Sequence, residues 1–169
     1  FVPDYGDRYF DCSVNAANKT STTLVANQLY LSEIHSAKDL LFSQIGLQVA
    51  TAVATGTAKV VIFKGGVKDF ESTDFPLTPV GIKMQISGVD YTFLKGVCYK
   101  VGIISSVSVV MRAIPIDAVM SMGTNIFSVT QQISCQRSVT LTYASIPMNE
   151  ADLVLTNLSQ VMPQVIYKL

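Results

Sequence analysis

The stretch TSTTLVANQLYLSEIH, residues 20–35, decides the fold class, and it holds the only histidine of the chain, His35. It opens with four small hydroxyl residues, becomes apolar at Leu24, and then alternates between apolar and polar positions up to Ile34. This alternation is closer to a period of two residues than to the 3.6 of a helix, which is typical of a strand. The stretch therefore predicts a polar lead-in followed by the first strand of a sheet. His35 is expected at the end of that strand rather than in an active site.

The same signal recurs along the chain and predicts about eight short strands with almost no helix. The further strand segments are DLLFSQIGLQVATAV (39–53), AKVVIFK (58–64), IKMQISG (82–88), YTFLKGVCYKVGIISSVSVVMRAI (91–114), RSVTLTYA (137–144) and QVIYKL (164–169). The long segment 91–114 is expected to hold two strands with a turn near Ser105, and one helical turn is expected around residues 117–122. The segment KGGVKDFESTDFPLTPVG (64–81) is predicted to be a long loop. The pattern predicts an all-β fold, an antiparallel β-sandwich that is jelly-roll-like.

The length of 169 residues is that of one domain. Residues 1–23 are expected to form an irregular N-terminal arm, because they combine Pro3, Gly6 and a polar run with scattered aromatic residues. Residues 24–169 are expected to form the sandwich domain.

The composition favours a protein that is buried in an assembly. Hydrophobic residues make up 49% of the chain and charged residues only 14%, against about 25% charged in an average soluble domain. The formal net charge is zero, so no long-range field would attract nucleic acid or an anionic membrane. No apolar run reaches the roughly 18 residues of a membrane span. We therefore expect neither nucleic-acid binding nor membrane insertion.

The sequence shows no catalytic apparatus. His35 is the single candidate imidazole, and a thiol dyad with Cys98 would place both groups on strand segments built for packing. Neither G-x-S-x-G nor a phosphate-binding G-x-x-x-x-G-K-[ST] is present. The three cysteines, Cys12, Cys98 and Cys135, match no metal spacing and are expected to be buried free thiols. The sequence thus predicts no enzyme, no catalytic residue, no cofactor and no metal.

Two groups of residues are candidates for binding another subunit or a glycan. Tyr5, Tyr9 and Phe10 lie in the arm, where aromatic rings stack on sugars or pack across interfaces; the alternative is that they pack back on their own domain. Asp69, Phe70, Glu71 and Asp74 lie together in KDFESTDF (68–75). Paired carboxylates could do glycosidase chemistry, but a solvated loop between strands is the interpretation that the sequence favours.

The chain resembles a β-sandwich domain common at the C-terminal ends of bacteriophage tail-fibre and other virion structural proteins. That family carries an L-x-A-N-x-L-Y strand, an F-x-x-I-G-x-x-V-T-T-A strand and an A-x-x-x-x-G-I-Y strand, to which Leu24–Tyr30, Phe42–Thr51 and Ala58–Phe63 correspond. Its L-x-x-G-x-x-Y-W-L element resembles FLKGVCYKVGI (93–103), with Lys100 in place of Trp, and its P-x-V-x-x-x-L end resembles PQVIYKL (163–169). The resemblance covers most of residues 9–169. Residues 65–81 lack the family's asparagine and glycine richness, and the chain has no Trp.

The resemblance implies a fold and a setting rather than catalytic residues. Its motifs are structural, so Asn27 and Tyr30 are expected at turn and strand positions. It implies a phage virion protein without enzyme activity, a homotrimeric fibre, spike or appendage domain for host attachment. Its partners would be other virion proteins and a host-surface glycan, and its location the tail or virion surface. The alternatives are a structural capsid-decorating or head-fibre protein on the capsid surface, and a carbohydrate-binding or carbohydrate-processing domain.

Overall fold

The computed structural model describes residues 9–10, 20–36, 38–115, 135–138, 141–158 and 161–168. Strands account for 61% of the structure and helices for 3%, and the sheets are antiparallel. This confirms the all-β antiparallel sandwich that the alternating segments predict. The jelly-roll connectivity is not confirmed and stays a prediction. The described helix is one short 3₁₀ turn, η3 (Glu150–Asp152).

The first sheet contains residues 161–168, which are inserted between two strands formed by earlier parts of the chain. Its order is β1 (Tyr9–Phe10), β16 (Val165–Lys168), β5 (Gln44–Thr51), β12 (Val109–Pro115) and β15 (Val161–Pro163). In addition, β2 (Thr20–Leu24) pairs with β12, and β9 (Gly81–Gln85) pairs with β5. β5 meets β12 only at Val110 and Met111. Beyond that point β16 pairs with β5 and β15 pairs with β12, so residues 161–168 lie between these two strands.

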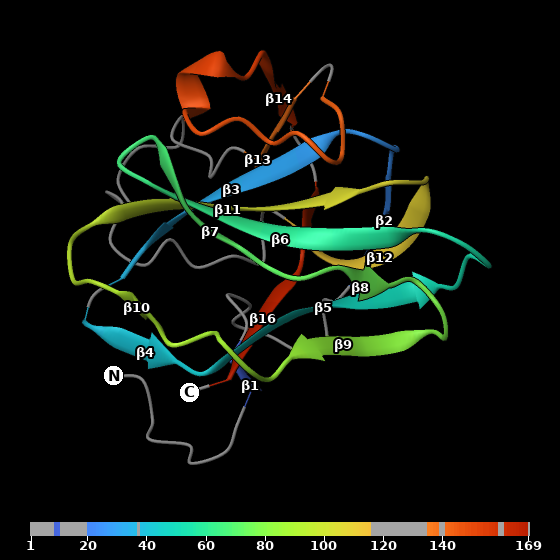
Figure 1. The fold of residues 1–169 in the computed structure, drawn as a ribbon, viewed down its shortest axis with the longest axis horizontal. Helices are drawn as coiled ribbons and strands as arrows, with labels where there is room; N and C mark the ends of the chain where they lie inside the picture. The colour runs from blue at the N-terminus through green and yellow to red at the C-terminus, as the bar shows by residue number, and fades with distance from the viewer. Residues whose placement is uncertain are drawn as a thin grey trace.

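The second sheet packs against the first (Figure 1). Its order is β14 (Leu155–Leu158), β13 (Cys135–Ser138), β3 (Leu29–His35), β11 (Cys98–Ser105), β6 (Thr57–Lys64) and β7 (Val67–Glu71), and β8 (Phe75–Pro76) pairs with β6. A separate two-stranded ribbon joins β4 (Leu40–Phe42) to β10 (Tyr91–Phe93). β3 ends at His35, as the sequence predicts.

The main core lies between the two sheets. Ile45, Leu47 and Val49 of β5 are each 0% exposed and form the buried face of this strand. Facing residues come from β3, β6 and β11, and they include Tyr30, Val60, Ile62, Tyr99, Val101 and Ile103. Each fully buried aliphatic side chain of this kind contributes about 1.5–3 kcal/mol relative to an exposed one, so this double layer is the main source of stability.

A second core covers the outer face of the second sheet. Leu29 and Leu31 point to the side of β3 opposite to Tyr30 and belong to this second cluster. Residues 141–154, here called the strap, cross that outer face (orange in Figure 1) and bury Ile146 and Leu153 against it. The second sheet is therefore buried on both sides, which explains why β6 and β11 are apolar at consecutive positions.

Two turns of the fold are closed by a tyrosine hydroxyl in the same way. Between β2 and β3, Asn27 adopts a left-handed conformation with a φ of 60°, and the hydroxyl oxygen of Tyr30 accepts a hydrogen bond from the backbone N–H of Val25 at 3.0 Å. Between β10 and β11, Gly96 takes the same place with a φ of 73°, and the Tyr99 hydroxyl accepts from the N–H of Leu94 at 3.0 Å.

The backbone repeats as well. Gln28 N–H donates to the Val25 carbonyl in the first turn, and Val97 N–H donates to the Leu94 carbonyl in the second, both at 3.3 Å. In each turn the tyrosine lies five residues after the N–H that it accepts from. The turn and strand roles expected for Asn27 and Tyr30 are thus confirmed.

Gly46 lets three strands of the first sheet approach closely. It lies on β5 opposite Ile166 of β16 on one side and Met84 of β9 on the other. A Cβ atom at this position would stand 2.0 Å from the carbonyl oxygen of Lys83, which is too close for any side chain. The glycine of the I-G pair is therefore required by packing.

Several boundaries differ from those that the sequence predicts. β2 already begins at Thr20, inside the expected arm, because Thr20 and Thr22 turn inward while Ser21 and Thr23 remain exposed along an edge strand. The predicted strand 137–144 ends as β13 at Ser138 in the described residues, and Leu141 onward belongs to the strap. The predicted strand at 82–88 is found as β9.

Aliphatic side chains in and directly after β9 are exposed. Ile82 is 51% exposed, and Ile86, directly after the strand, is 72% exposed. Among the described strands β9 pairs with β5 alone and lies at a sheet edge. The helical turn expected at residues 117–122 lies outside the described residues. Of the arm, residues 9–10 and 20–23 are described, and the boundary at residue 24 stays a prediction.

Candidate functional site

Two of the three acidic residues predicted as a cluster in KDFESTDF lie on a strand, and the third lies in the short connection that follows it. Asp69, Phe70 and Glu71 belong to β7, and Asp74 directly precedes β8. The loop prediction for residues 64–81 is therefore wrong for residues 67–71 and 75–76, whereas residues 72–74 are irregular as predicted. β7 alternates exposed and half-buried positions, and the carboxylates of Asp69 and Glu71 lie on its exposed side.

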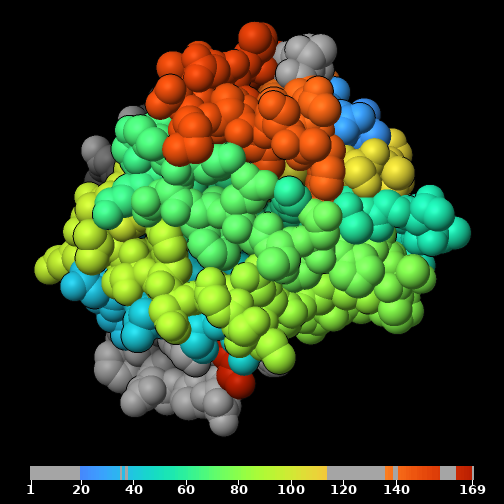
Figure 2. All heavy atoms as spheres, viewed as in Figure 1, coloured from blue at the N-terminus to red at the C-terminus, as the bar shows by residue number. Residues whose placement is uncertain are grey.

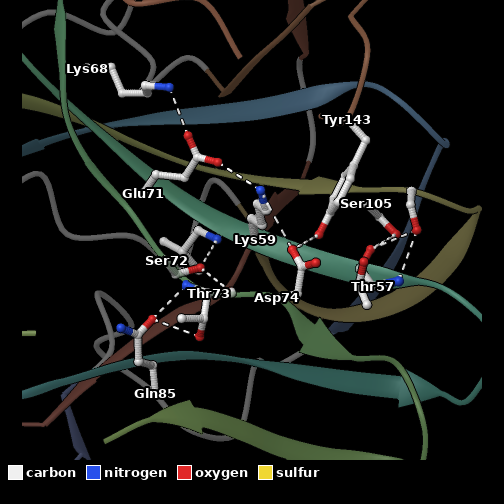
Figure 3. A network of polar contacts seen from close by, with 12 residues as sticks. Thr57, Lys59, Lys68, Glu71, Ser72, Thr73, Asp74, Gln85, Ser105 and Tyr143 are labelled. Carbon is white, nitrogen blue, oxygen red and sulfur yellow. Dashed lines mark hydrogen bonds and ion pairs between the residues drawn. The ribbon is translucent and has the colours of Figure 1, made fainter. Parts of the chain in front are cut away.

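Glu71 and Asp74 share one lysine of the neighbouring strand β6 (Figure 3). The Lys59 ammonium lies 2.9 Å from Glu71 Oε1 and 3.7 Å from Asp74 Oδ1. Glu71 binds a second cation, since its Oε2 lies 2.8 Å from Lys68 Nζ. Both carboxylates are thus neutralised by lysines of their own chain.

These ion pairs set the charge states of the cluster. Burial alone would raise the pKa of Glu71, but the hydrogen bonds and positive charges of Lys68 and Lys59 outweigh it and hold this pKa below its usual value. The hydrogen bond to Glu71 raises the pKa of Lys59 in turn, and burial opposes this only in part. A general acid of a glycosidase needs a carboxyl pKa raised toward neutrality, and the pKa of Glu71 is shifted the other way.

Asp74 connects the cluster to the strap. Its Oδ1 accepts a hydrogen bond of 2.8 Å from the Tyr143 hydroxyl, and Lys59 lies 5.3 Å from the centre of the Tyr143 ring. The backbone N–H of Tyr143 donates to Oδ1 of Asn27, the left-handed residue of the first tyrosine-closed turn, at 3.2 Å. Burial and the hydrogen bond to Asp74 raise the pKa of Tyr143, so its hydroxyl stays protonated and can donate.

Further contacts fasten the rest of the strap. Lys68 Nζ donates to the Ile146 carbonyl at 3.0 Å, and the backbone N–H of Lys68 donates to the Met148 carbonyl at 2.7 Å. Glu150 forms an ion pair with Lys100 of β11. The polar network of β6 and β7 therefore holds the strap over the second core, which is a structural role.

Sequence reasoning missed the neutral members of this network. The Ser72 hydroxyl accepts a hydrogen bond from Val60 N–H at 2.9 Å, and Thr73 N–H donates to Gln85 Oε1 at 2.8 Å (Figure 3). These contacts connect the segment after β7 to β6 and β9. Serine, threonine and glutamine carry no signal that would have singled them out in the sequence.

Asp69 and Phe70 face a different group. The Tyr91 hydroxyl of β10 donates a 2.6 Å hydrogen bond to Asp69 Oδ2, and the rings of Phe70 and Tyr91 lie 5.8 Å apart in an edge-to-face arrangement. Burial and the hydrogen bond to Asp69 raise the pKa of Tyr91. Tyr91 was not singled out by the sequence, because it lies 22 residues from Asp69.

The aromatic candidates of the arm are described only in part. Tyr5 lies outside the described residues. The backbone of Tyr9 and Phe10 forms β1, which pairs with Lys168 and Tyr167 of β16. The structure thus does not bring Tyr9 and Phe10 to the cluster on β7 by any described contact.

Cys98 is an exposed free thiol, so the expectation of a buried one is wrong for this residue. It starts β11, where its backbone is opposite His35 of β3. Burial of part of the thiol and a hydrogen bond to Glu33 raise the pKa of Cys98 to about 11. A nucleophilic cysteine needs a lowered pKa, so this thiol is not activated. Cys12 lies outside the described residues.

The described residues contain neither a metal cluster nor a membrane-spanning helix. In the described ranges, no three His, Cys, Asp or Glu residues are grouped so that they could hold a metal ion. No helix in the same ranges is long and apolar enough to cross a membrane. No protein-family model matches the chain, and no curated protein matches its sequence.

Proposed function

We propose that this chain is a non-enzymatic structural protein of a bacteriophage virion, a domain of a fibre, spike or other surface appendage that attaches the particle to its host. The observation that carries the proposal is the shared tyrosine-closed turn. LVANQLY and FLKGVCY are two separate elements of the family resemblance, and each encodes this same turn with Asn27 or Gly96 at its left-handed position.

The other residues of the resemblance also have structural reasons. Leu24, Phe42 and Ile45 are at most 1% exposed in the main core, and Gly46 is required by the approach of β9. Residues of this kind are retained when a fold is shared. They support a common β-sandwich, while the role in attachment comes from the setting of the resembling proteins, because a fold alone does not define a function.

The polar network supports a role without catalysis. Glu71 and Asp74 bind lysines and a tyrosine of their own chain and fasten the strap. A hydrolytic pair of carboxylates would have to face a bound substrate instead. The carbohydrate-processing alternative therefore finds no support from these two residues.

The surface supports assembly with other copies and other virion proteins. Leu41 is 62%, Ile86 72% and Val154 66% exposed, on a chain of zero formal charge. A neutral surface with exposed aliphatic groups promotes association. We propose a homotrimer, which would bury part of this surface and present three copies of any weak attachment site.

Solution mass tests the oligomer, and microscopy tests the location. Light scattering over a dilution series should give a stable species near three times 18.3 kDa. An antibody against the chain should label tails or surface appendages of the phage particle. Labelling confined to the capsid shell would favour the decorating alternative, and a monomer that labels no particle would contradict the proposal.

A further inference from the structure

A β-bulge turns Asp69 out of the ladder between β6 and β7. Phe70 pairs with Ile62 and Lys68 pairs with Phe63, so Asp69 is the extra residue, opposite no residue of β6. Bulges of this kind redirect side chains and are enriched next to binding sites. In a regular strand, neighbouring side chains point to opposite faces.

The bulge brings two adjacent side chains to one tyrosine. Asp69 Oδ2 accepts the 2.6 Å hydrogen bond of the Tyr91 hydroxyl, and the Phe70 ring lies 5.8 Å from the Tyr91 ring. The ring of Tyr91 also packs against two further aromatic rings, since its centre lies 5.5 Å from that of Phe42 and 5.8 Å from that of Phe93. Figure 2 shows the atoms of β7 and β10, in green and yellow-green, on the same face of the molecule.

Asp69 differs from the other carboxylates of the predicted cluster. Glu71 binds two lysines, and Asp74 binds Lys59 and Tyr143. Asp69 is exposed, and among the described residues its carboxylate is bound only by the neutral hydroxyl of Tyr91. An ionised carboxylate can accept about four hydrogen bonds, so most of its capacity faces solvent.

We propose that Asp69, Phe70 and Tyr91 form a contact site for a neutral sugar unit of a cell-surface polysaccharide. The carboxylate would accept hydrogen bonds from sugar hydroxyls, and the half-buried rings would pack against the C–H face of the sugar. Acidic sugars are disfavoured, because no lysine or arginine of the described residues pairs with Asp69. The inference rests on the proposed attachment function and names its ligand.

A lysine or arginine of a partner protein could also bind a carboxylate beside aromatic rings. The single carboxylate and its tyrosine donor favour a polyhydroxylated ligand, because a cation site gains from several negative groups. Salt distinguishes the two ligands. Exposed charge pairs weaken as ionic strength rises, whereas hydrogen bonds to a neutral sugar and ring contacts change little.

The test is binding of the purified oligomer to an array of neutral and acidic bacterial polysaccharides. We expect binding to at least one neutral polysaccharide and a change below about twofold between 0.1 and 0.5 M salt. Asp69→Asn should weaken this binding by about tenfold or more, since hydrogen bonds to charged groups are the stronger ones. The control Asp152→Asn, at an exposed carboxyl on η3, should bind like the unmodified protein.

A second variant keeps the test valid if Asp69→Asn fails to fold. Phe70→Leu retains an apolar side chain against the core and removes the ring, so it should unfold at nearly the same temperature and bind about tenfold more weakly. The inference is overturned if no polysaccharide binds, if Asp69→Asn and Phe70→Leu bind like the unmodified protein, or if binding is lost in salt. Such results leave the proposed function standing where the antibody still labels the particle. Absence from the particle refutes the proposed function itself.

Discussion

Removing the hydroxyl group of Tyr99 should destabilise the fold without disturbing its aromatic packing. Tyr99→Phe keeps the ring against Phe93, whose centre lies 4.7 Å away. The variant loses the partly buried hydrogen bond from the N–H of Leu94 at 3.0 Å and a longer one, of 3.5 Å, that the hydroxyl donates to the Thr92 carbonyl. The net value of such a bond is about 1 kcal/mol, and leaving a buried donor unpaired costs about 1–3 kcal/mol. We expect a loss of about 1–2 kcal/mol, because water reaches this turn in part.

Tyr30→Phe should cost the same amount, since its hydroxyl accepts from Val25 N–H in an equivalent turn. Tyr99 pairs with Ile34, four residues along β3 from Tyr30, a separation of about 13 Å at the rise of a strand. Effects at that distance add, so the double variant should lose about 2–4 kcal/mol.

Urea unfolding followed by circular dichroism measures these values, with Tyr143→Phe as the matched control. The Tyr143 hydroxyl donates to the exposed Asp74, and water can replace that bond, so the control should stay within about 0.5 kcal/mol. The account of the two turns is refuted if Tyr99→Phe and Tyr30→Phe are no more destabilising than this control.

Four further outcomes are expected. Ile146→Ala should cost about 2–3 kcal/mol in urea unfolding, because it removes buried carbon from the second core, whereas Met148→Ala, 57% exposed on the same strap, should cost little; equal losses would contradict the anchoring role. Gly46→Ala should cost about 3 kcal/mol or more or prevent folding, since its Cβ would meet a carbonyl oxygen at 2.0 Å; a normally folded variant by circular dichroism would show the packing argument to be wrong. Because the pKa of Glu71 is lowered from 4.5, its ion pairs stabilise the fold above pH 4.5, and this stabilisation is lost as the pH falls through the folded-state pKa. Glu71→Gln should therefore reduce the loss of stability at acid pH in urea unfolding, and an unchanged acid dependence would refute the role of these ion pairs. Alkylation of Cys98 by iodoacetamide, followed by peptide mass spectrometry, should rise with pH until about 11; a midpoint near 8.5 would count against the shielding of this thiol.

The sandwich could be predicted because apolar residues recur at every second position of a strand that buries one face. Ile45, Leu47 and Val49 recur at every second position, with Gly46 and Gln48 between them, and all three proved to be fully buried. The same rule of alternation failed for edge strands that are rich in polar residues. Thr20–Thr23 and Val67–Glu71 are predicted to be a lead-in and a loop, because hydroxyl residues make up most of β2 and charged residues occupy three of the five positions of β7.

The partners of the predicted cluster could not be found from the sequence. Tyr143 is 69 residues away from Asp74, and Tyr91 is 22 residues away from Asp69. These contacts depend on which strands become neighbours and on a bulge that shifts the register by one residue. Spacing along the chain carries neither kind of information. The sequence therefore located the acidic cluster but could not identify the tyrosines that bind it.

The position of residues 161–168 between β5 and β12 bears on how the protein is made. On the ribosome, β5 and β12 emerge well before the segment that lies between them, so the first sheet cannot close until synthesis has passed residue 168. Until then a nascent chain holds open strand edges, which are prone to mispairing. The first sheet should therefore close only after residue 168 has left the ribosome, and an assembly pathway would gain from keeping neighbouring nascent chains apart until this segment is in place.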